Sequence, residues 1–156
     1  MADSILLCHT SVGPGEILAS LKAERYPTRW LFLGQDYLKL LEWRGLLGPS
    51  ADFVDIGPLL NRATEQLREP FLQLITELGR RYQSIAWWAS RVSERNTLVS
   101  ALFLYCCYLR IGQESLSNHE GTLCVVGESW ALLESLSDFG NSNDCRVKWV
   151  KRPALG

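Results

Sequence analysis

Short runs of β-forming residues alternate along this sequence with longer segments of helical periodicity. Two parallel strands need a crossover connection, which is usually a helix, so this alternation is typical of βαβ units. The sequence therefore predicts an α/β fold with a mainly parallel sheet of about six strands, in one domain over residues 1–150. Residues 151–156 are expected to be a tail or the start of an interdomain linker. The expected strands cover residues 5–8, 30–33, 53–56, 84–89, 122–126 and 146–150.

Local signals place the helices between these strands. Asp36 is a good N-cap for the second helix, which Gly48 and Pro49 should end. Pro70 should kink the third helix or begin another, because proline has no amide hydrogen. Ser93 should cap the fourth helix, which is apolar on nearly every face and should be the most buried. The expected helices cover residues 16–25, 37–48, 59–82, 94–111 and 127–136.

The composition narrows the class of protein. A formal net charge of −1 at pH 7 gives the chain as a whole no basic footprint for nucleic acid or anionic lipid. The five cysteines are odd in number and lack the paired spacing of zinc sites, which favours reduced, buried thiols and no metal. The longest apolar run, residues 98–109, is shorter than the ~20 residues that span a bilayer. With no signal-peptide pattern, the sequence predicts a cytoplasmic protein without a transmembrane segment.

The loop after the first expected strand contains His9, Ser11, Gly13 and Gly15. In open α/β sheets ligands bind beyond the carboxyl ends of the strands, and free amides at a helix N-terminus favour a phosphate or carboxylate. His9 is a candidate catalytic base, and Ser11, Gly13 and Gly15 are candidate substrate-binding residues. The alternative is structural: the glycines would serve a turn that requires positive φ, and His9 would be a hydrogen-bonded structural residue.

The same loop suggests a dinucleotide or S-adenosylmethionine as a second possibility. Gly13-Pro14-Gly15 is similar to the opening of a dinucleotide fingerprint, and Asp36 follows the second strand where a ribose-binding acid is expected. Leu18 stands at the third glycine position of that fingerprint, where a bulky side chain would obstruct helix–strand packing. The leading expectation therefore includes no cofactor.

A second cluster of candidate residues surrounds the end of the fourth expected strand. Paired indoles can stack against a sugar, guanidinium groups can bind phosphate, and a glutamate can accept a proton. The alternative is that the tryptophans pack into the helical layers while the charged residues solvate a helix end. The candidate catalytic residue is Glu94, and the candidate binding residues are Trp87, Trp88, Ser90, Arg91, Arg95 and Asn96.

The third candidate place is the turn after the fifth expected strand, where Gly127-Glu128-Ser129-Trp130 opens a helix, with Glu128 and Ser129 as candidate binding residues. A helix N-terminus there could bind a hydroxyl or a phosphate, and ordinary capping is the alternative. Since parallel strands end at one edge of a sheet, all three places are expected to share a rim.

The stretch Trp87-Trp88-Ala89-Ser90 with Glu94-Arg95-Asn96, followed by an apolar helix, resembles the N-terminal region of bacterial surface-carbohydrate biosynthesis proteins. These are related to GT-B glycosyltransferases, which have two Rossmann-like domains. The resemblance implies a three-layer Rossmann-like domain on the acceptor side of such an enzyme. It implies a carbohydrate or sugar-phosphate acceptor as partner, and a C-terminal domain that binds the nucleotide sugar.

In that family pattern the 87–96 cluster would line the acceptor cleft, with His9, Ser11 and the Gly13 loop on its neighbouring wall. Glu94 or His9 would then be the base that deprotonates the acceptor hydroxyl. The chain has no metal-binding DxD triplet and no donor-binding signature, so it is expected to be catalytically incomplete alone. A non-catalytic interaction module remains an alternative, because tryptophan and arginine dominate binding energies at protein interfaces.

Overall fold

The computed structural model describes residues 4–23, 25–118 and 120–150, and the chain divides into two compact units. The sheet unit comprises residues 1–56 and 112–156, and the helical unit comprises residues 57–111. In the sequence the helical unit is therefore an insertion between the third and fourth strands.

The sheet unit contains a five-stranded, all-parallel sheet in the order β3-β2-β4-β1-β5. The central strands are buried along almost their whole length, as expected when helices cover both faces of a parallel sheet. This confirms the α/β class and the parallel sheet. The strands are β1 (Ser4–His9), β2 (Arg29–Leu33), β3 (Asp52–Phe53), β4 (Thr122–Gly127) and β5 (Arg146–Trp149).

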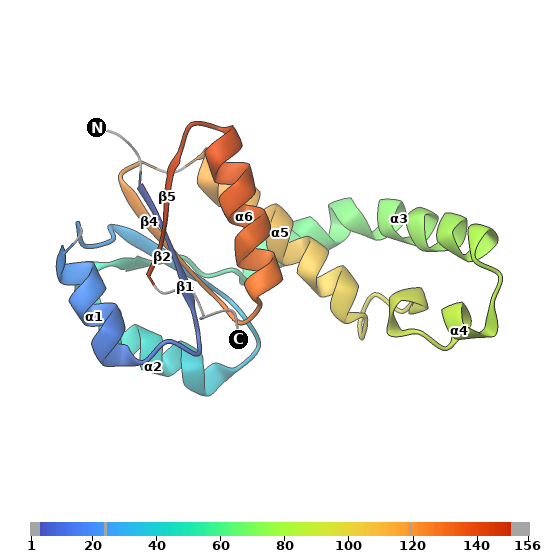
Figure 1. Ribbon diagram of the computed structural model, residues 1–156, viewed down its shortest axis with the longest axis horizontal. Coiled ribbons are helices and arrows are strands. Elements are labelled where there is room, and N and C mark those ends of the chain that lie inside the picture. The colour runs from blue at the N-terminus through green and yellow to red at the C-terminus, as the bar shows by residue number, and fades with distance from the viewer. Residues whose placement is uncertain (1–3, 24, 119, 151–156) are drawn as a thin grey trace. The chain divides into compact units, whose positions relative to one another are not determined.

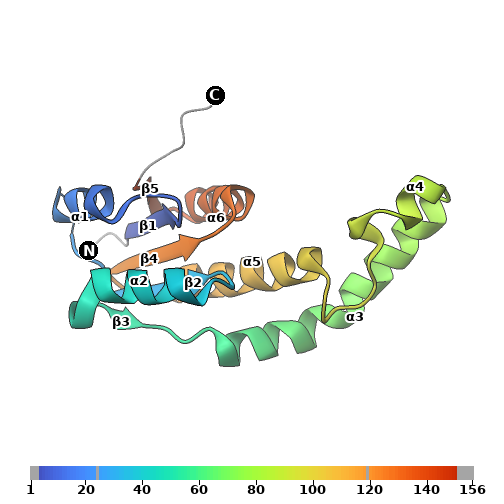
Figure 2. The ribbon, with the colours of Figure 1, turned by 90° about the horizontal axis from the view of Figure 1, so that it is seen from below.

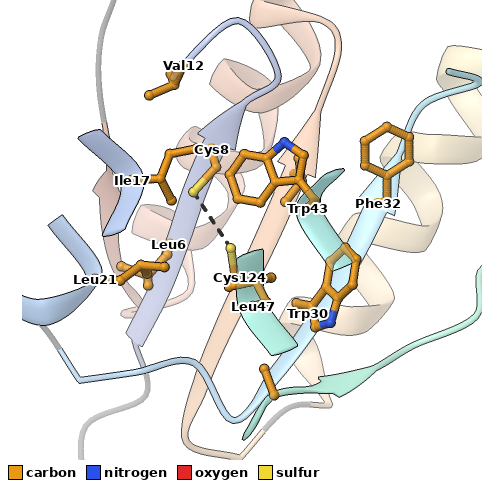
Figure 3. Packing of buried hydrophobic residues seen from close by; sticks show 12 residues of the cluster. Leu6, Cys8, Val12, Ile17, Leu21, Trp30, Phe32, Trp43, Leu47 and Cys124 are labelled. Carbon is orange, nitrogen blue, oxygen red and sulfur yellow. Dashed lines mark hydrogen bonds between the residues drawn. The ribbon is translucent and has the colours of Figure 1, made fainter. Parts of the chain in front are cut away.

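Helices α1 (Pro14–Ala23) and α2 (Tyr37–Leu47) cover one face of the sheet, and α6 (Trp130–Ser142) covers the other (Figure 1). Alternate strand residues point to opposite faces, so each strand supplies both cores. The result is a three-layer, Rossmann-like fold. The core beneath α1 and α2 includes Leu6, Cys8, Ile17, Leu21, Trp30, Phe32, Trp43, Leu47, Cys124 and Val126 (Figure 3).

The chain leaves β1 and β4 in opposite directions. From β1 it passes through α1 to β2, on the far side of β4, and from β4 it passes through α6 to β5, on the far side of β1. These two connections cover opposite faces of the sheet (Figure 1), so the loops that leave the adjacent ends of β1 and β4 turn to opposite faces, and a crevice opens between them at this topological switch point. The fold therefore marks the β1 and β4 ends as the favoured ligand position.

The helical unit contains α3 (Gly57–Arg81), the short α4 (Ile85–Trp88) and the first part of α5 (Ala101–Ser117). Phe71 of α3 packs on Phe103 of α5 with ring centroids 5.0 Å apart. In both views α4 lies beside the end of α3 (Figure 1, Figure 2). Pro70 lies inside α3 without ending it. The buried apolar side chains of this unit are those of Ala63, Phe71, Ile75, Phe103, Cys107, Tyr108 and Ile111.

The strand predicted at residues 84–89 is wrong, and the sheet has five strands rather than six. A short apolar run does not distinguish a strand from a helical turn by periodicity. Here the Ser84 hydroxyl accepts a hydrogen bond from the Trp87 amide at 3.1 Å and caps α4. Ile85 is 89% exposed, so the segment has no sheet neighbours to cover it.

The start predicted for the fourth helix is also wrong. Ser93 belongs to a 3₁₀ turn, and α5 begins at Ala101, with the Ser100 hydroxyl accepting from the Phe103 amide at 3.2 Å. Between them the Glu94 carboxylate accepts from the Asn96 amide at 2.8 Å. Such local side-chain bonds offer the backbone an alternative to the helix. Leu102 and Tyr105 are exposed, so α5 is not the fully buried helix that its composition indicates.

All five cysteines are free thiols; Cys8, Cys107 and Cys124 are buried, as predicted, whereas Cys106 and Cys145 are only partly buried. The Cys8 and Cys124 sulfurs lie 3.7 Å apart in the core between β1 and β4 (Figure 3). Burial raises the pKa of Cys8 well above its ordinary value, so this thiol stays protonated. Over residues 4–23, 25–118 and 120–150, no helix is long and apolar enough to cross a membrane.

Candidate ligand site at the carboxyl edge of the sheet

Three strand ends meet at the carboxyl edge of the sheet. His9 of β1 is in register with Gly127 of β4, and Gly127 is in register with Leu33 of β2. The Thr10 amide donates to the Gly127 carbonyl at 3.0 Å and ties the first two loops together. The prediction that the loops after the first strand and after residues 122–126 share a rim is thus confirmed, and the loop after β2 joins them.

His9 lies at this edge with both ring nitrogens engaged. The Ser11 amide donates to Nδ1 at 3.1 Å, so Nδ1 carries the lone pair. Nε2 must then carry the hydrogen, which it donates to the Glu128 carbonyl at 3.0 Å. The Ser11 Oγ lies 2.7 Å from Nδ1 and donates to the same lone pair. The network assigns a neutral imidazole whose basic nitrogen faces a hydroxyl group.

The surroundings of His9 keep its ring neutral. Burial lowers the pKa of His9 below its ordinary value, and the Lys39 cation acts in the same direction. The hydrogen bond to the Glu128 carbonyl and the charge of the Glu128 carboxylate oppose this shift. A neutral imidazole can accept a proton, as a general base requires.

An aromatic stack extends from the His9 ring. Trp130 stacks on His9 with centroids 4.1 Å apart and planes 4° from parallel. Trp149, at the end of β5, stacks on Trp130 at 5.3 Å and 28°. Both indoles are only partly buried. Partly exposed indole faces beside a base suit a ligand with an apolar ring face, such as a sugar.

Glu128 connects the β4 loop to the β2 loop through its carboxylate. The Gln35 amide donates to Oε2 at 3.0 Å, and the Asp36 amide donates to Oε1 at 3.1 Å. The Glu128 carboxylate can lie this close to the β2 loop only because residue 34 is a glycine. A Cβ at position 34 would lie 2.5 Å from the Glu128 Cδ. Glu128 therefore has two roles: its carboxylate fixes the loop, and its carbonyl orients His9.

The explanation of Gly13 and Gly15 by positive φ is wrong. Among the described glycines only Gly48 and Gly121 have positive φ. A Cβ at Gly13 or Gly15 would meet nothing within 4 Å, so neighbouring atoms do not require these glycines either. Because Gly13 and Gly15 have no side chains, the backbone at the start of α1 is left uncovered, on the same rim as His9.

Ser129 acts as a cap. Its hydroxyl accepts from the Leu132 amide at 3.3 Å at the first turn of α6. The capping alternative for Ser129 therefore has direct support. Glu128 instead makes the loop connection described above, whereas the sequence predicted it to bind a hydroxyl or a phosphate.

The dinucleotide alternative departs from the fingerprint in two respects. In that fingerprint the first two strands are neighbours, but here β4 lies between β1 and β2. The Asp36 carboxylate accepts from the Leu38 and Lys39 amides at 3.0 and 3.2 Å and so caps α2. Neither feature favours a ribose at Asp36.

The 87–96 cluster belongs to the helical unit and does not follow a strand of the sheet. The prediction that these residues follow a strand, and reach the rim of the sheet in that way, is therefore wrong. The Trp87 ring lies tilted against Tyr82 with ring centroids 6.0 Å apart, and its Nε1 is buried without a hydrogen-bond partner. The Arg95 guanidinium lies 5.6 Å from the Trp88 ring centroid. Ligand binding by these residues stays a prediction.

The polar residues of this cluster bond mainly to their own segment. Ser90 Oγ donates to the Trp87 carbonyl at 2.7 Å, and the Asn96 Oδ1 accepts from the Leu98 amide at 3.0 Å. The Glu94 carboxylate is exposed and binds the Asn96 amide, as described above. These contacts give Glu94 a turn-forming role, and its role as a base stays a prediction. Arg91 lies exposed in the 3₁₀ turn.

Sequence reasoning missed four residues of the rim, whereas Trp130 belongs to the turn that was predicted as the third candidate place. Trp149 ends the last strand, and its position beside β1 depends on strand order, which the sequence does not display. The remaining three residues act on Glu128 or His9. Gly34 leaves room for the Glu128 carboxylate, the Gln35 amide donates to that carboxylate, and, besides burial, the charge of Lys39 lowers the pKa of His9.

A shallow hollow of about 730 Å³ lies at the opposite edge of the sheet. It is lined by residues at the amino ends of β2 and β3, including Thr28, Asp52 and Phe53, with Arg44 at 5.6 Å from the Phe53 ring centroid. Ligands of open α/β sheets bind at the other edge, so this hollow is the weaker candidate. Over the described residues, no group of three or more His, Cys, Asp or Glu side chains is arranged to hold a metal.

Comparison of the chain with protein-family models, curated proteins and solved structures finds no match. Functional inference therefore depends on the site itself.

Proposed function

We propose that this chain is the acceptor-side, Rossmann-like domain of a GT-B-like glycosyltransferase that serves bacterial surface polysaccharide biosynthesis. In this proposal the carboxyl edge of the sheet receives a carbohydrate or sugar-phosphate acceptor. The observation that carries it is the neutral His9 imidazole at the switch point, with a hydroxyl 2.7 Å from its basic nitrogen. The resemblance of residues 87–96 to surface-carbohydrate proteins supports the same class.

The Ser11 hydroxyl shows that Nδ1 can hold a hydroxyl group at proton-transfer distance. In the proposed reaction an acceptor hydroxyl displaces both the hydroxyl and the amide of Ser11 from the Nδ1 lone pair, and gives its proton to Nδ1 as the oxygen forms a bond to the anomeric carbon of the donor. The bond between that carbon and the phosphate oxygen breaks, and the electron pair leaves with the nucleotide. A C-terminal domain would supply the nucleotide sugar.

Two contacts stabilise the imidazolium that this step creates. Nε2–H keeps its hydrogen bond to the Glu128 carbonyl, and the stacked Trp130 ring offers its π-face to the cation. Trp149 extends the aromatic surface on which the acceptor sugar would stack. The open amides at Gly13 and Gly15 would hold a phosphate of the acceptor.

The experiment is an amide NMR titration of the full chain with free sugars, glycosyl phosphates, inorganic phosphate, a dinucleotide and S-adenosylmethionine. We expect a glycosyl phosphate to shift the resonances of the His9–Gly15 and Glu128–Trp130 loops, and His9→Gln to weaken this binding. The matched control is His119→Gln, which removes the other histidine of the sequence.

Three results would count against the proposal. Shifts confined to residues 87–96 would move the acceptor site to the helical unit. Saturable binding of the dinucleotide or S-adenosylmethionine alone would favour the Rossmann-enzyme alternative. Inorganic phosphate acting as well as glycosyl phosphate would show that no sugar is recognised.

A further inference from the structure

The helical unit exposes apolar side chains to an unusual degree between α4 and α5. Leu98 is 91% exposed, Ile85 89%, Val99 68% and Trp88 51%. Val92 is exposed as well, at 44%. Single exposed apolar residues need no explanation, but five within fifteen residues mark an interaction surface. We call these five residues the 85–99 surface.

This stretch folds as one local structure. The Ser93 hydroxyl donates to the Trp88 and Ser90 carbonyls at 3.2 and 2.9 Å, which ties the 3₁₀ turn to α4. Arg95 lies over the Trp88 ring, which brings the following loop to the same place. The apolar side chains therefore project from neighbouring turns.

The residues around this surface carry a net positive charge. Residues 80–100 contain four arginines and one glutamate, a net charge of +3, whereas the whole chain carries −1. The arginines are Arg80, Arg81, Arg91 and Arg95, and all four are exposed. An apolar surface within a basic surround is complementary to an anionic lipid surface.

The polar side chains of the stretch favour lipid over a protein partner. Ser84, Ser90, Ser93, Glu94 and Asn96 all hydrogen-bond to backbone atoms of their own segment. A typical protein interface carries about ten direct hydrogen bonds, for which this surface offers mainly its arginines. Insertion of aliphatic side chains at the headgroup boundary requires no such bonds, and arginines can bind lipid phosphates there.

We propose that the 85–99 surface docks the protein onto the surface of an anionic membrane. Ile85, Leu98 and Val99 would insert at the boundary between headgroups and acyl chains, with Trp88 at headgroup level. Arg91 and Arg95 would contact lipid phosphates. The inference uses only the helical unit and is independent of the function proposed for the sheet edge.

The test is co-sedimentation of the full chain with vesicles of phosphatidylcholine alone, or with about 30 mol% phosphatidylglycerol. We expect binding to the anionic vesicles only, weakened at about 0.5 M salt because screening reduces the attraction of the arginines. Leu98→Ser with Val99→Ser, and separately Arg91→Glu with Arg95→Glu, should each reduce the partition coefficient roughly tenfold or more.

Leu38→Ser is the matched control, because Leu38 is 76% exposed but belongs to α2 of the sheet unit. It should bind vesicles like the unaltered chain. Circular dichroism spectra and thermal unfolding of all variants establish that they are folded. Since the altered side chains are exposed, we expect no change in either measurement.

Several outcomes would overturn the inference. The unaltered chain could fail to bind anionic vesicles, or the serine variants could bind as well as Leu38→Ser. Equal binding to both vesicle types would reject the role of the arginines. Analytical ultracentrifugation separates a further case: concentration-dependent self-association abolished by the serine pair, without lipid binding, would show that the surface joins two copies of the chain.

Discussion

The strands of the sheet unit and the 85–99 surface of the helical unit differ in how far they bury similar apolar side chains. In the sheet unit, strand residues such as Leu7 are fully buried, and the loops at the carboxyl edge are joined by hydrogen bonds that His9 donates and the Glu128 carboxylate accepts. In the helical unit, Leu98 is almost fully exposed and polar groups bond within their own segment. The comparison teaches that apolar sequence indicates burial only where a second layer exists to cover it.

The largest expected effect contrasts one leucine from each unit. Leu7→Ala removes a side chain that is 0% exposed and should lower the free energy of unfolding by about 2–5 kcal/mol. Leu98→Ala should change it by less than about 0.5 kcal/mol, because the side chain is 91% exposed. Urea denaturation of both variants measures the difference. Equal losses would show that Leu98 is covered in solution and that the contrast between the units fails.

The second prediction concerns the contact between the β2 and β4 loops. Gly34→Ala places a methyl group where the Glu128 carboxylate now lies, at 2.5 Å from Cδ. It should cost about 1–3 kcal/mol in unfolding free energy through crowding and loss of the Gln35 and Asp36 hydrogen bonds. It should also disturb the tautomer of His9, because the carbonyl of Glu128 moves, and ring ¹⁵N chemical shifts report this.

Gly45→Ala is the matched control for this glycine change. Gly45 lies inside α2, and an added Cβ would meet nothing within 4 Å. Alanine is the better helix former, so stability should rise by about 0.5–1 kcal/mol with the His9 signals unchanged. If Gly34→Ala also causes no loss of stability, the Glu128 carboxylate does not occupy this position beside Gly34 in solution.

The smallest expected effect is the dependence of stability on pH. The pKa of His9 is lowered in the folded chain, mainly by burial, from an ordinary value of 6.5. The unfolded chain therefore binds a proton first as the pH falls, and the folded chain loses stability between pH 6.5 and its own lower pKa. Above pH 6.5 this contribution is fully present.

The difference in unfolding free energy between the unaltered chain and His9→Gln, measured across this range, isolates the effect. It should decline as the pH falls and then level off, because other titrating groups are common to both proteins. A difference that is flat or grows on acidification would contradict the neutral, buried imidazole.

The sequence predicts the sheet better than the helical unit, for a physical reason. The run 122–126 is apolar and β-branched, and a parallel strand covered on both faces has that pattern. The run 84–89 is apolar too, but a serine cap and exposure to solvent make it a helical turn. Periodicity over six residues does not separate the two cases.

The candidate site is predictable in part for a similar reason. His9 and Glu128 stand at the ends of recognisable strands, so their place at one rim follows from parallel pairing. The Glu128 contact with the Gln35 and Asp36 amides does not follow, because it requires β4 to lie beside β2. Strand order is a property of the whole chain and leaves no local signal at Gly34 or Gln35.

The position of β4 between β1 and β2 also governs when the sheet can assemble. Residues 4–56 contain three of the five strands, yet β1 has no partner among them, since both of its neighbours come after residue 121. Pairing of Leu7 with Val125 and Trp149 joins residues more than a hundred positions apart. Contacts of such separation slow folding. During synthesis the first strand must therefore remain with its edges unpaired until β4 and then β5 have left the ribosome.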